Sequence, residues 1–168
     1  MDVVGGPSYL KRVIYGALGS ELIPARVRTQ LMRGLGFDIS PSATIWSSCT
    51  FRSNNVKIGF AVFLNVGFFY DGSDRLEIGD NVRMGQFVRI ITSTHKVGPP
   101  EQRCLFEAVT GPVVIESGCW IGANSVVLPG VTIRRGCVIG ANSLVSKSTE
   151  PNGLYVGSPA RRLRDLPL

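Results

Sequence analysis

The stretch PVVIESGCWIGANSVVLPGVTIRRGCVIGANSLVSKS, from Pro112 to Ser148, decides the fold. An aliphatic residue returns at every sixth position, and a small or β-branched residue follows four places behind most of them. The aliphatic positions are Ile115, Ile121, Val127, Ile133, Ile139 and Val145. A helix repeats every 3.6 residues and a strand every two, so neither alone explains a period of six. A short strand followed by a turn does explain it, and three such sides close one coil of a solenoid.

The same period appears earlier in the chain, with small shifts of phase, between residues 39 and 95. Its members are Ile39, Ile45, Phe51, Ile58, Leu64, Tyr70, Ile78, Met84 and Ile90. The segment that follows lacks the period, so we expect a loop over 96–111 to project from the solenoid. The N-terminal segment YLKRVIYGALGSELIPARVRTQLMRGLG predicts short amphipathic helices. The sequence thus predicts one domain over 1–168, with a helical cap over 1–38, repeats over 39–148 and a tail over 149–168.

Composition and charge indicate which kinds of partner the protein binds. The chain has 168 residues and a net charge of +6, so an anionic partner is expected. The basic residues are scattered and form no nucleic-acid-binding motif, which favours a phosphorylated small molecule over nucleic acid. No apolar run is long enough to cross a bilayer, and the basic N-terminal segment is expected to pack on the protein rather than on a membrane. The four cysteines lack CxxC spacing and are interpreted as reduced thiols of a cytoplasmic protein.

His95 is the only histidine, and it lies where the period stops. A lone histidine is commonly an ordinary surface residue. Its place at the edge of the solenoid changes this interpretation, because a neighbouring chain could complete a cleft there. Imidazole has an unperturbed pKa near 6.5, so its neutral form can accept a proton from a hydroxyl at physiological pH.

The pattern IG-x₄, seen in IGFAVF, IGDNVR, IGANSV and IGANSL, is typical of hexapeptide-repeat proteins. The segments TSTHKVGPPEQR and GCWIGANSVVLPGVTI together resemble the O-acetyltransferases of the maltose, galactoside and nodulation-factor type. The resemblance implies an all-β fold, a left-handed parallel β-helix of triangular cross-section. It also implies a homotrimer with active sites between chains, acetyl-CoA as the acetyl donor, a sugar or glycoconjugate hydroxyl as acceptor, and no metal.

The resemblance also implies roles for individual residues. His95 corresponds to the general base, and Asn65 to an asparagine that contacts the acceptor. Glu107 matches an acidic residue of the loop, where it either orients the imidazole, binds the acceptor or is a solvated carboxylate. Asn65 has an alternative too, as a corner residue that tolerates unusual backbone angles. The family places an aspartate shortly after that asparagine, but Gly72 occupies the slot here and Asp71 lies one place earlier, which leaves the sugar preference open.

The resemblance assigns more residues to the binding of coenzyme A than to the acceptor and the base. Trp120 would border the cleft near the thioester, and the corner residues Ala123 and Ala141 would meet the pantetheine arm with their backbone N–H groups. Four polar or basic residues would bind the nucleotide end: Ser146, Lys147, Arg161 and Arg164.

Several alternatives stay open. Related hexapeptide enzymes acetylate an antibiotic hydroxyl or an amino sugar with the same base. A γ-class carbonic anhydrase would need three histidines around zinc, and this chain has one. A non-catalytic β-helix scaffold would not need a base, an exposed tryptophan and tail cations at the family's spacing.

Overall fold

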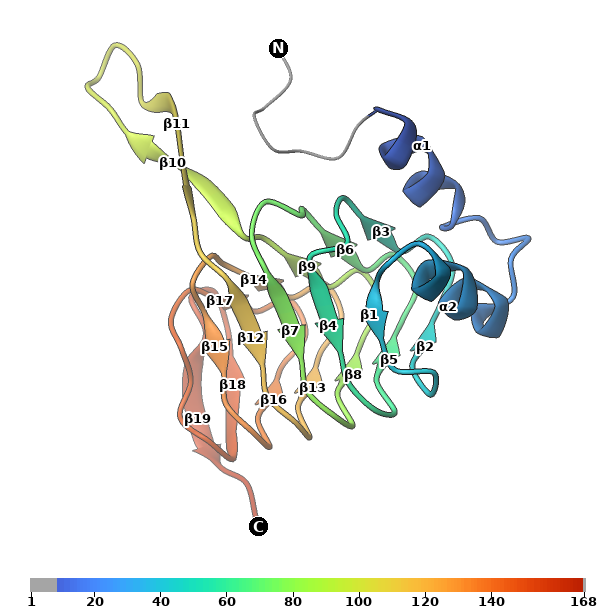
Figure 1. Ribbon diagram of the computed structural model, residues 1–168. Helices are drawn as coiled ribbons and strands as arrows, with labels where there is room; N and C mark the ends of the chain where they lie inside the picture. Colours follow the sequence, from blue (N-terminus) through green and yellow to red (C-terminus); the bar gives the residue numbers. More distant parts are fainter. Residues whose placement is uncertain (1–8, 168) are drawn as a thin grey trace.

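A computed structural model describes residues 9–167, and it shows short strands stacked into three sheets around a common axis (Figure 1). Sheet A contains β1 (Asp38–Ile39), β4 (Val56–Ile58), β7 (Leu76–Ile78), β12 (Val113–Ile115) and β15 (Thr132–Ile133). Sheet B contains β2 (Thr44–Ile45), β5 (Phe63–Leu64), β8 (Arg83–Met84), β13 (Trp120–Ile121), β16 (Val138–Ile139), β18 (Gly153–Val156) and β19 (Arg161–Asp165). Sheet C contains β3 (Thr50–Phe51), β6 (Phe69–Tyr70), β9 (Arg89–Ile90), β14 (Val126–Val127) and β17 (Leu144–Val145).

The six-residue period places one buried residue on each side of every coil. In sheet A, for example, Ile58 pairs in parallel register with Ile78, and Ile115 with Ile133. These side chains point inward and are almost completely buried. Successive side chains alternate across a strand, so the residue before each of them faces outward. The strands therefore form a parallel β-helix, the fold that the resemblance predicts.

Most corners of the β-helix contain one residue in the left-handed backbone region. At the corner between sheets B and C, which we call corner BC, these residues include Gly67, Asn124 and Asn142. Glycine and asparagine tolerate this conformation better than other residues. The N–H of Asn142 donates to the carbonyl of Ala123 in the coil before it, at 2.9 Å. Equivalent corner positions therefore stack in columns along the axis, and we call the column between sheets C and A corner CA.

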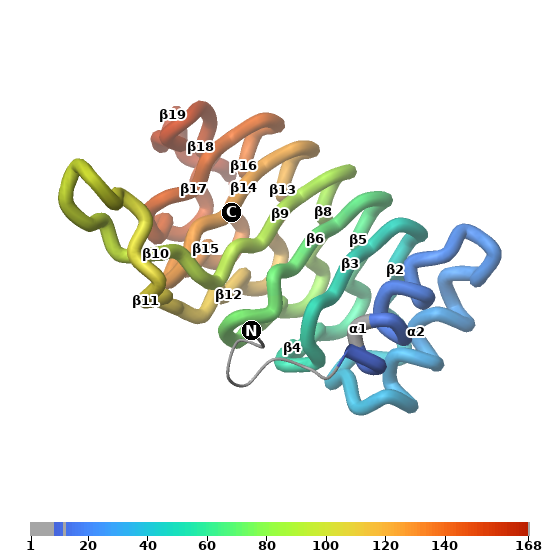
Figure 2. Tube along the Cα trace, turned by 90° about the horizontal axis from the view of Figure 1, so that it is seen from above, coloured from blue at the N-terminus to red at the C-terminus, as the bar shows by residue number. Residues whose placement is uncertain are grey.

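Two helices cover the N-terminal end of the β-helix, α1 (Tyr9–Ala17) and α2 (Ala25–Gly34) (Figures 1 and 2). Tyr15, Met32 and Phe37 are buried against the first coil. The helical segment is thus confirmed by α1 and α2, although Asp38, placed in the predicted cap, belongs to β1. Residues 1–8 of the predicted cap lie outside the described part. In that part, neither helix has the length and hydropathy to cross a membrane.

Arg28 ties this cap to the first coil. Its guanidinium is 2% exposed and donates four hydrogen bonds to backbone carbonyls. The acceptors are Leu18 O at 2.6 Å, Ser20 O at 2.7 Å, Ile23 O at 2.7 Å and Ile45 O at 2.8 Å. Burial lowers the pKa of Arg28 below its ordinary value. The carbonyl dipoles compensate for the water that the cation has lost.

The segment expected to be a loop over 96–111 projects from the body as predicted, but it is a β-hairpin with different bounds. β10 (Ser93–Val97) pairs antiparallel with β11 (Cys104–Thr110), with Ser93 opposite Thr110 (Figures 1 and 2). The repeats therefore end before residue 93 rather than at 95. Antiparallel pairing between two segments far from each other in the sequence does not follow a six-residue period, so periodicity could not detect it.

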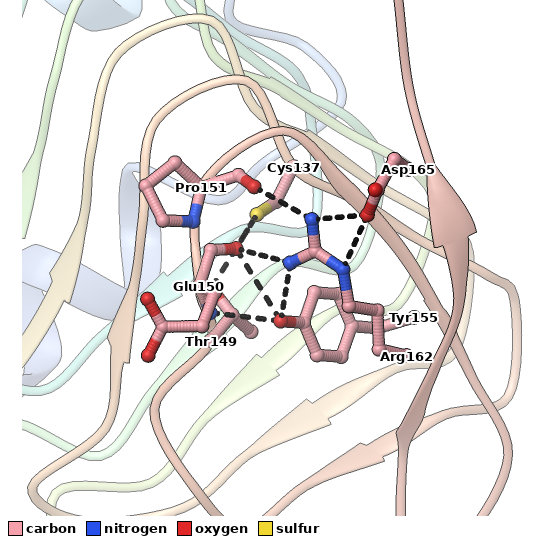
Figure 3. A network of polar contacts seen from close by, with 7 residues as sticks. All are labelled: Cys137, Thr149, Glu150, Pro151, Tyr155, Arg162 and Asp165. Carbon is pink, nitrogen blue, oxygen red and sulfur yellow. Dashed lines mark hydrogen bonds and ion pairs between the residues drawn. The ribbon is translucent and has the colours of Figure 1, made fainter.

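The predicted tail over 149–168 is also more ordered than expected. β18 pairs in parallel with β16 and extends sheet B beyond the last repeat, while β19 returns antiparallel beside it. Arg162 joins them, since its guanidinium contacts Asp165 Oδ1 at 2.6 and 2.8 Å and Tyr155 Oη at 3.1 Å (Figure 3). It also donates to the carbonyls of Glu150 and Pro151. This network fixes the strand on which Arg161 and Arg164 lie.

Candidate active site

His95 lies in the projecting hairpin, within β10 and opposite Ala108 in β11. It is therefore not at the end of the repeat, where the sequence placed it, but on an arm that leaves corner CA. The side chain is exposed, and among residues 9–167 its imidazole has no hydrogen-bond partner. Both ring nitrogens are thus available to groups that come from outside this chain.

Glu107 contacts Lys96 and not the imidazole, which it would have to contact in one of the three alternatives. Its Oε1 lies 2.6 Å from Lys96 Nζ, and both side chains are more than half exposed. Lys96 follows His95 and Glu107 precedes Ala108, so alternation along the strands turns this pair to the opposite face of the hairpin. Within one chain, the structure therefore gives Glu107 no contact with the imidazole and favours the solvated carboxylate among the alternatives.

Asn65 is the first residue after β5, at corner BC, and it is half-buried. The left-handed backbone of this corner falls on Gly67, two residues later, so Asn65 is not required by an unusual backbone angle. Its Oδ1 accepts the N–H of Val66 at 2.8 Å. This bond orients the side chain and leaves its amide NH₂ as a hydrogen-bond donor for a ligand.

The structure explains why glycine occupies position 72, where the family pattern places an aspartate. Its φ is +74°, and a Cβ atom at this position would lie 2.7 Å from the backbone nitrogen of Ser53. No side chain fits without a shift of the backbone. The neighbouring Asp71 instead turns to the hairpin, where it accepts hydrogen bonds from Thr92 and Ser93.

Corner BC presents open backbone donors next to an exposed tryptophan. Trp120, in β13, is 59% exposed. Ala123 and Ala141 occupy the same corner position in successive coils, and among residues 9–167 neither of their N–H groups donates a hydrogen bond. A Cβ atom on Gly122 would lie 2.5 Å from the nitrogen of Ala141, so only glycine leaves room for that corner. An extended chain with carbonyl acceptors can approach both N–H groups here.

The four residues predicted to bind the nucleotide end are exposed, but they lie in two places. Ser146 and Lys147 follow β17 at corner CA, whereas Arg161 and Arg164 lie on β19, the edge strand of sheet B. In the described part of the chain, none of the three cations forms an ion pair. Sequence reasoning missed Arg162, the arginine between them, because nothing in the run ARRLR distinguishes a structural arginine from a binding one.

Apart from Arg161 and Arg164 on β19, the candidate residues therefore belong to two different corners of the triangle. Corner CA carries the hairpin with His95 and Glu107, and also Ser146 and Lys147. Trp120 and its neighbours at corner BC, among them Asn65, Ala123 and Ala141, lie on the other side of sheet C. One chain does not bring these two groups together.

The buried cysteines offer no second nucleophile. Burial raises the pKa of the Cys49 thiol to about 11 and that of the Cys119 thiol to about 12, so both are protonated at neutral pH. All four cysteines are free thiols. Residues 9–167 also contain no cluster of three or more histidine, cysteine or acidic side chains with the arrangement of a metal site.

The chain is similar to known acetyltransferases over most of its length. Residues 112–147 match the family model described as bacterial transferase hexapeptide (six repeats). Nodulation protein L of Rhizobium meliloti (strain 1021) is 41% identical over 133 residues, which cover 78% of this chain and 71% of that protein.

Two solved structures extend the similarity to the whole fold. A hexapeptide-repeat acetyltransferase of Vibrio cholerae O1 biovar eltor, complexed with acetyl coenzyme A, is 31% identical with a TM-score of 0.76, covering 93% of this chain and 87% of that one. A maltose O-acetyltransferase of Clostridium difficile 630 is 26% identical with a TM-score of 0.74, covering 95% and 88%. Together these similarities confirm the resemblance found in the sequence. The chain belongs to the hexapeptide-repeat acetyltransferase family.

Proposed function

We propose that this enzyme transfers an acetyl group from acetyl-CoA to a hydroxyl of a sugar or glycoconjugate, with His95 as the general base. The observation that carries the proposal is the position of His95. It is the only imidazole of the chain, exposed on a projecting arm and without a partner in the described residues. The Vibrio cholerae relative complexed with acetyl coenzyme A supports the proposed donor, and the maltose O-acetyltransferase of Clostridium difficile supports the proposed class of acceptor.

In the proposed reaction, His95 first accepts a proton and then donates it. As the acceptor oxygen bonds to the thioester carbonyl carbon, the imidazole takes the proton of the hydroxyl. When the carbon–sulfur bond breaks, the imidazolium returns this proton to the departing sulfur. General-base assistance of this kind accelerates a reaction by about 10²–10⁴-fold.

The open donors at corner BC fit the pantetheine arm of coenzyme A. We propose that the N–H groups of Ala123 and Ala141 donate to its amide carbonyls, with Trp120 beside the thioester. The exposed Lys147, Arg161 and Arg164 have the charge that the phosphates of the nucleotide end require, and Ser146 lies next to the first of them. The side-chain NH₂ group of Asn65 would then donate a hydrogen bond to a hydroxyl of the acceptor.

We propose a homotrimer, because the two groups of site residues lie on different corners of one chain. A neighbouring chain that sets its corner BC against corner CA would complete the site, with the hairpin reaching across. Rotational symmetry then repeats the same site at each interface. The whole chain would form one domain of this trimer, and the four free thiols are consistent with a cytoplasmic location.

The test of the activity is thiol release from acetyl-CoA with a panel of acceptors. The panel contrasts glycosides with amino sugars and hydroxylated antibiotics. Turnover with glycosides supports the proposal. Turnover with amino sugars alone would contradict O-acetylation, and no turnover with any acceptor would contradict the proposed acceptor class.

Loss of a tail or corner cation should weaken cofactor binding. Lys147→Ala and Arg161→Ala are each expected to raise the Kd of coenzyme A about 3–10-fold, more at low salt than at high, because screening weakens exposed charge pairs. Calorimetry at two ionic strengths measures this. Arg135→Ala, which removes an exposed charge at another corner, is the matched control and should leave the Kd unchanged. Equal affinities for all three variants would remove Lys147 and Arg161 from the site.

A further inference from the structure

Asp71 holds the base of the catalytic hairpin. It lies at corner CA, one coil before the hairpin leaves the same corner. Its carboxylate oxygens accept the N–H of Thr92 at 3.0 and 3.1 Å and the hydroxyl of Ser93 at 3.0 Å. The hydroxyl of Thr92 also donates to Oδ1. One carboxylate thus satisfies three donors on the two residues where the hairpin begins.

The residues around Asp71 make this attachment rigid. Thr92 is completely buried, and its hydroxyl oxygen accepts the N–H of Asp74 at 2.9 Å. Its carbonyl accepts the N–H of Gly111 at 3.0 Å, which closes the hairpin at its other end. The hydroxyl of the buried Tyr70 donates in turn to the carbonyl of Asp74. The hairpin base is therefore joined to the preceding coil through side chains as well as backbone.

The backbone pairing of β10 with β11 places His95 opposite Ala108, and the bond between Asp71 and Ser93 anchors the start of this strand. Ser93 and His95 are two residues apart in β10, so their side chains point to the same face of the hairpin. A shift of one residue in the strand would turn His95 to the opposite face. The pairing of β10 with β11 becomes irregular between His95 and Val97, so the register beyond His95 does not by itself prevent such a shift.

We propose that Asp71 is a positioning residue, which fixes the face of the hairpin that His95 presents to the acceptor. The inference rests on the proposed function of His95 as general base. A displacement of about 1 Å in a reacting group can cost roughly 10²-fold in rate. Asp71→Asn is therefore expected to lower kcat about 10–100-fold, because an NH₂ group, which cannot accept a hydrogen bond, replaces one of the two carboxylate oxygens that accept from Thr92 and Ser93. The KM for acetyl-CoA should stay the same, since the substitution leaves the residues proposed to bind coenzyme A unchanged.

Asp80→Asn is the matched control. Asp80 is also a corner aspartate that accepts a backbone N–H, from Phe60 at 2.7 Å, but it does not contact the hairpin. Its variant should keep the kcat of the wild type within about twofold, the range in which surface substitutions act. Ser93→Ala removes a single bond of the network. It should give a smaller loss of kcat than Asp71→Asn, and it keeps the test decisive if Asp71→Asn does not fold.

A second readout does not depend on activity. The chain has one histidine, so a histidine-labelled protein gives a single imidazole signal in an NMR spectrum. In Asp71→Asn this signal is expected to broaden or split, and amide hydrogen exchange over 93–110 to accelerate, whereas Asp80→Asn leaves both unchanged. An unchanged signal with unchanged kcat would overturn the inference, as would a change confined to the KM of the acceptor. Full activity of His95→Ala would instead overturn the proposed function.

Discussion

His95→Ala is expected to lower kcat by about 10²–10⁴-fold, the contribution of a general base. The imidazole is exposed and forms no hydrogen bond with residues 9–167, so its removal should not change the stability or the assembly of the protein. Coenzyme A should bind with the affinity of the wild type, because His95 is not among the residues proposed to contact it. Thiol release under saturating acetyl-CoA, together with calorimetry and light scattering, measures these quantities.

Glu107→Gln is the control for this result. Glu107 pairs with Lys96 in solvent, and exposed pairs of this kind contribute about 0–1 kcal/mol. We therefore expect near-normal turnover. If His95→Ala kept its turnover, another group would have to be the base. If Glu107→Gln lost as much as His95→Ala, the carboxylate would act in the site of a neighbouring chain.

Arg28→Leu is expected to cause the largest loss of stability. The substitution removes the guanidinium donors from two buried carbonyl oxygens, those of Leu18 and Ile45, and from two partly buried ones, those of Ser20 and Ile23. An unsatisfied buried polar group costs about 1–3 kcal/mol, and partial relaxation reduces the sum. We expect the free energy of unfolding to fall by about 3–5 kcal/mol. Arg28→Lys should recover only part of this, because an ammonium group lacks the planar fork of the guanidinium.

Urea denaturation followed by circular dichroism tests the effect, at one protein concentration because assembly adds to apparent stability. Arg26→Leu is the control. Arg26 lies on the same helix but is exposed, so its substitution should change the free energy of unfolding by less than about 0.5 kcal/mol. Equal effects of the two variants would show that the bonds of Arg28 do not hold the cap in place.

The body of the fold could be predicted from the period of the sequence. The six-residue spacing placed the inward residues of each coil, and Leu64 and Ile121, two of its members, are completely buried. The hairpin could not be predicted in this way. Its pairing joins Ser93 to Thr110 across a turn, and its attachment depends on Asp71, a residue one coil away. Such contacts depend on how coils stack, which local spacing does not describe.

The candidate site was predictable to a similar extent. Ala123 and Ala141 are 18 residues apart, three sides of the triangle, so the period alone places them in one column. Asp71 and Arg162 were not recognised as structural residues, because nothing in the local sequence indicates which neighbours their side chains meet. The handedness of the coil came from the resemblance alone, since a period of six is compatible with either hand.

The most direct test of the account is whether two damaged chains can rebuild one site. His95→Ala removes the base at one corner, and Ala141→Trp blocks the cofactor groove at the other. Each variant alone should be inactive. In trimers co-expressed from equal amounts of both, about a quarter of the interfaces should join an intact His95 to an intact groove, so about a quarter of the wild-type turnover should return. Mixed trimers that stay inactive would contradict an active site shared between chains.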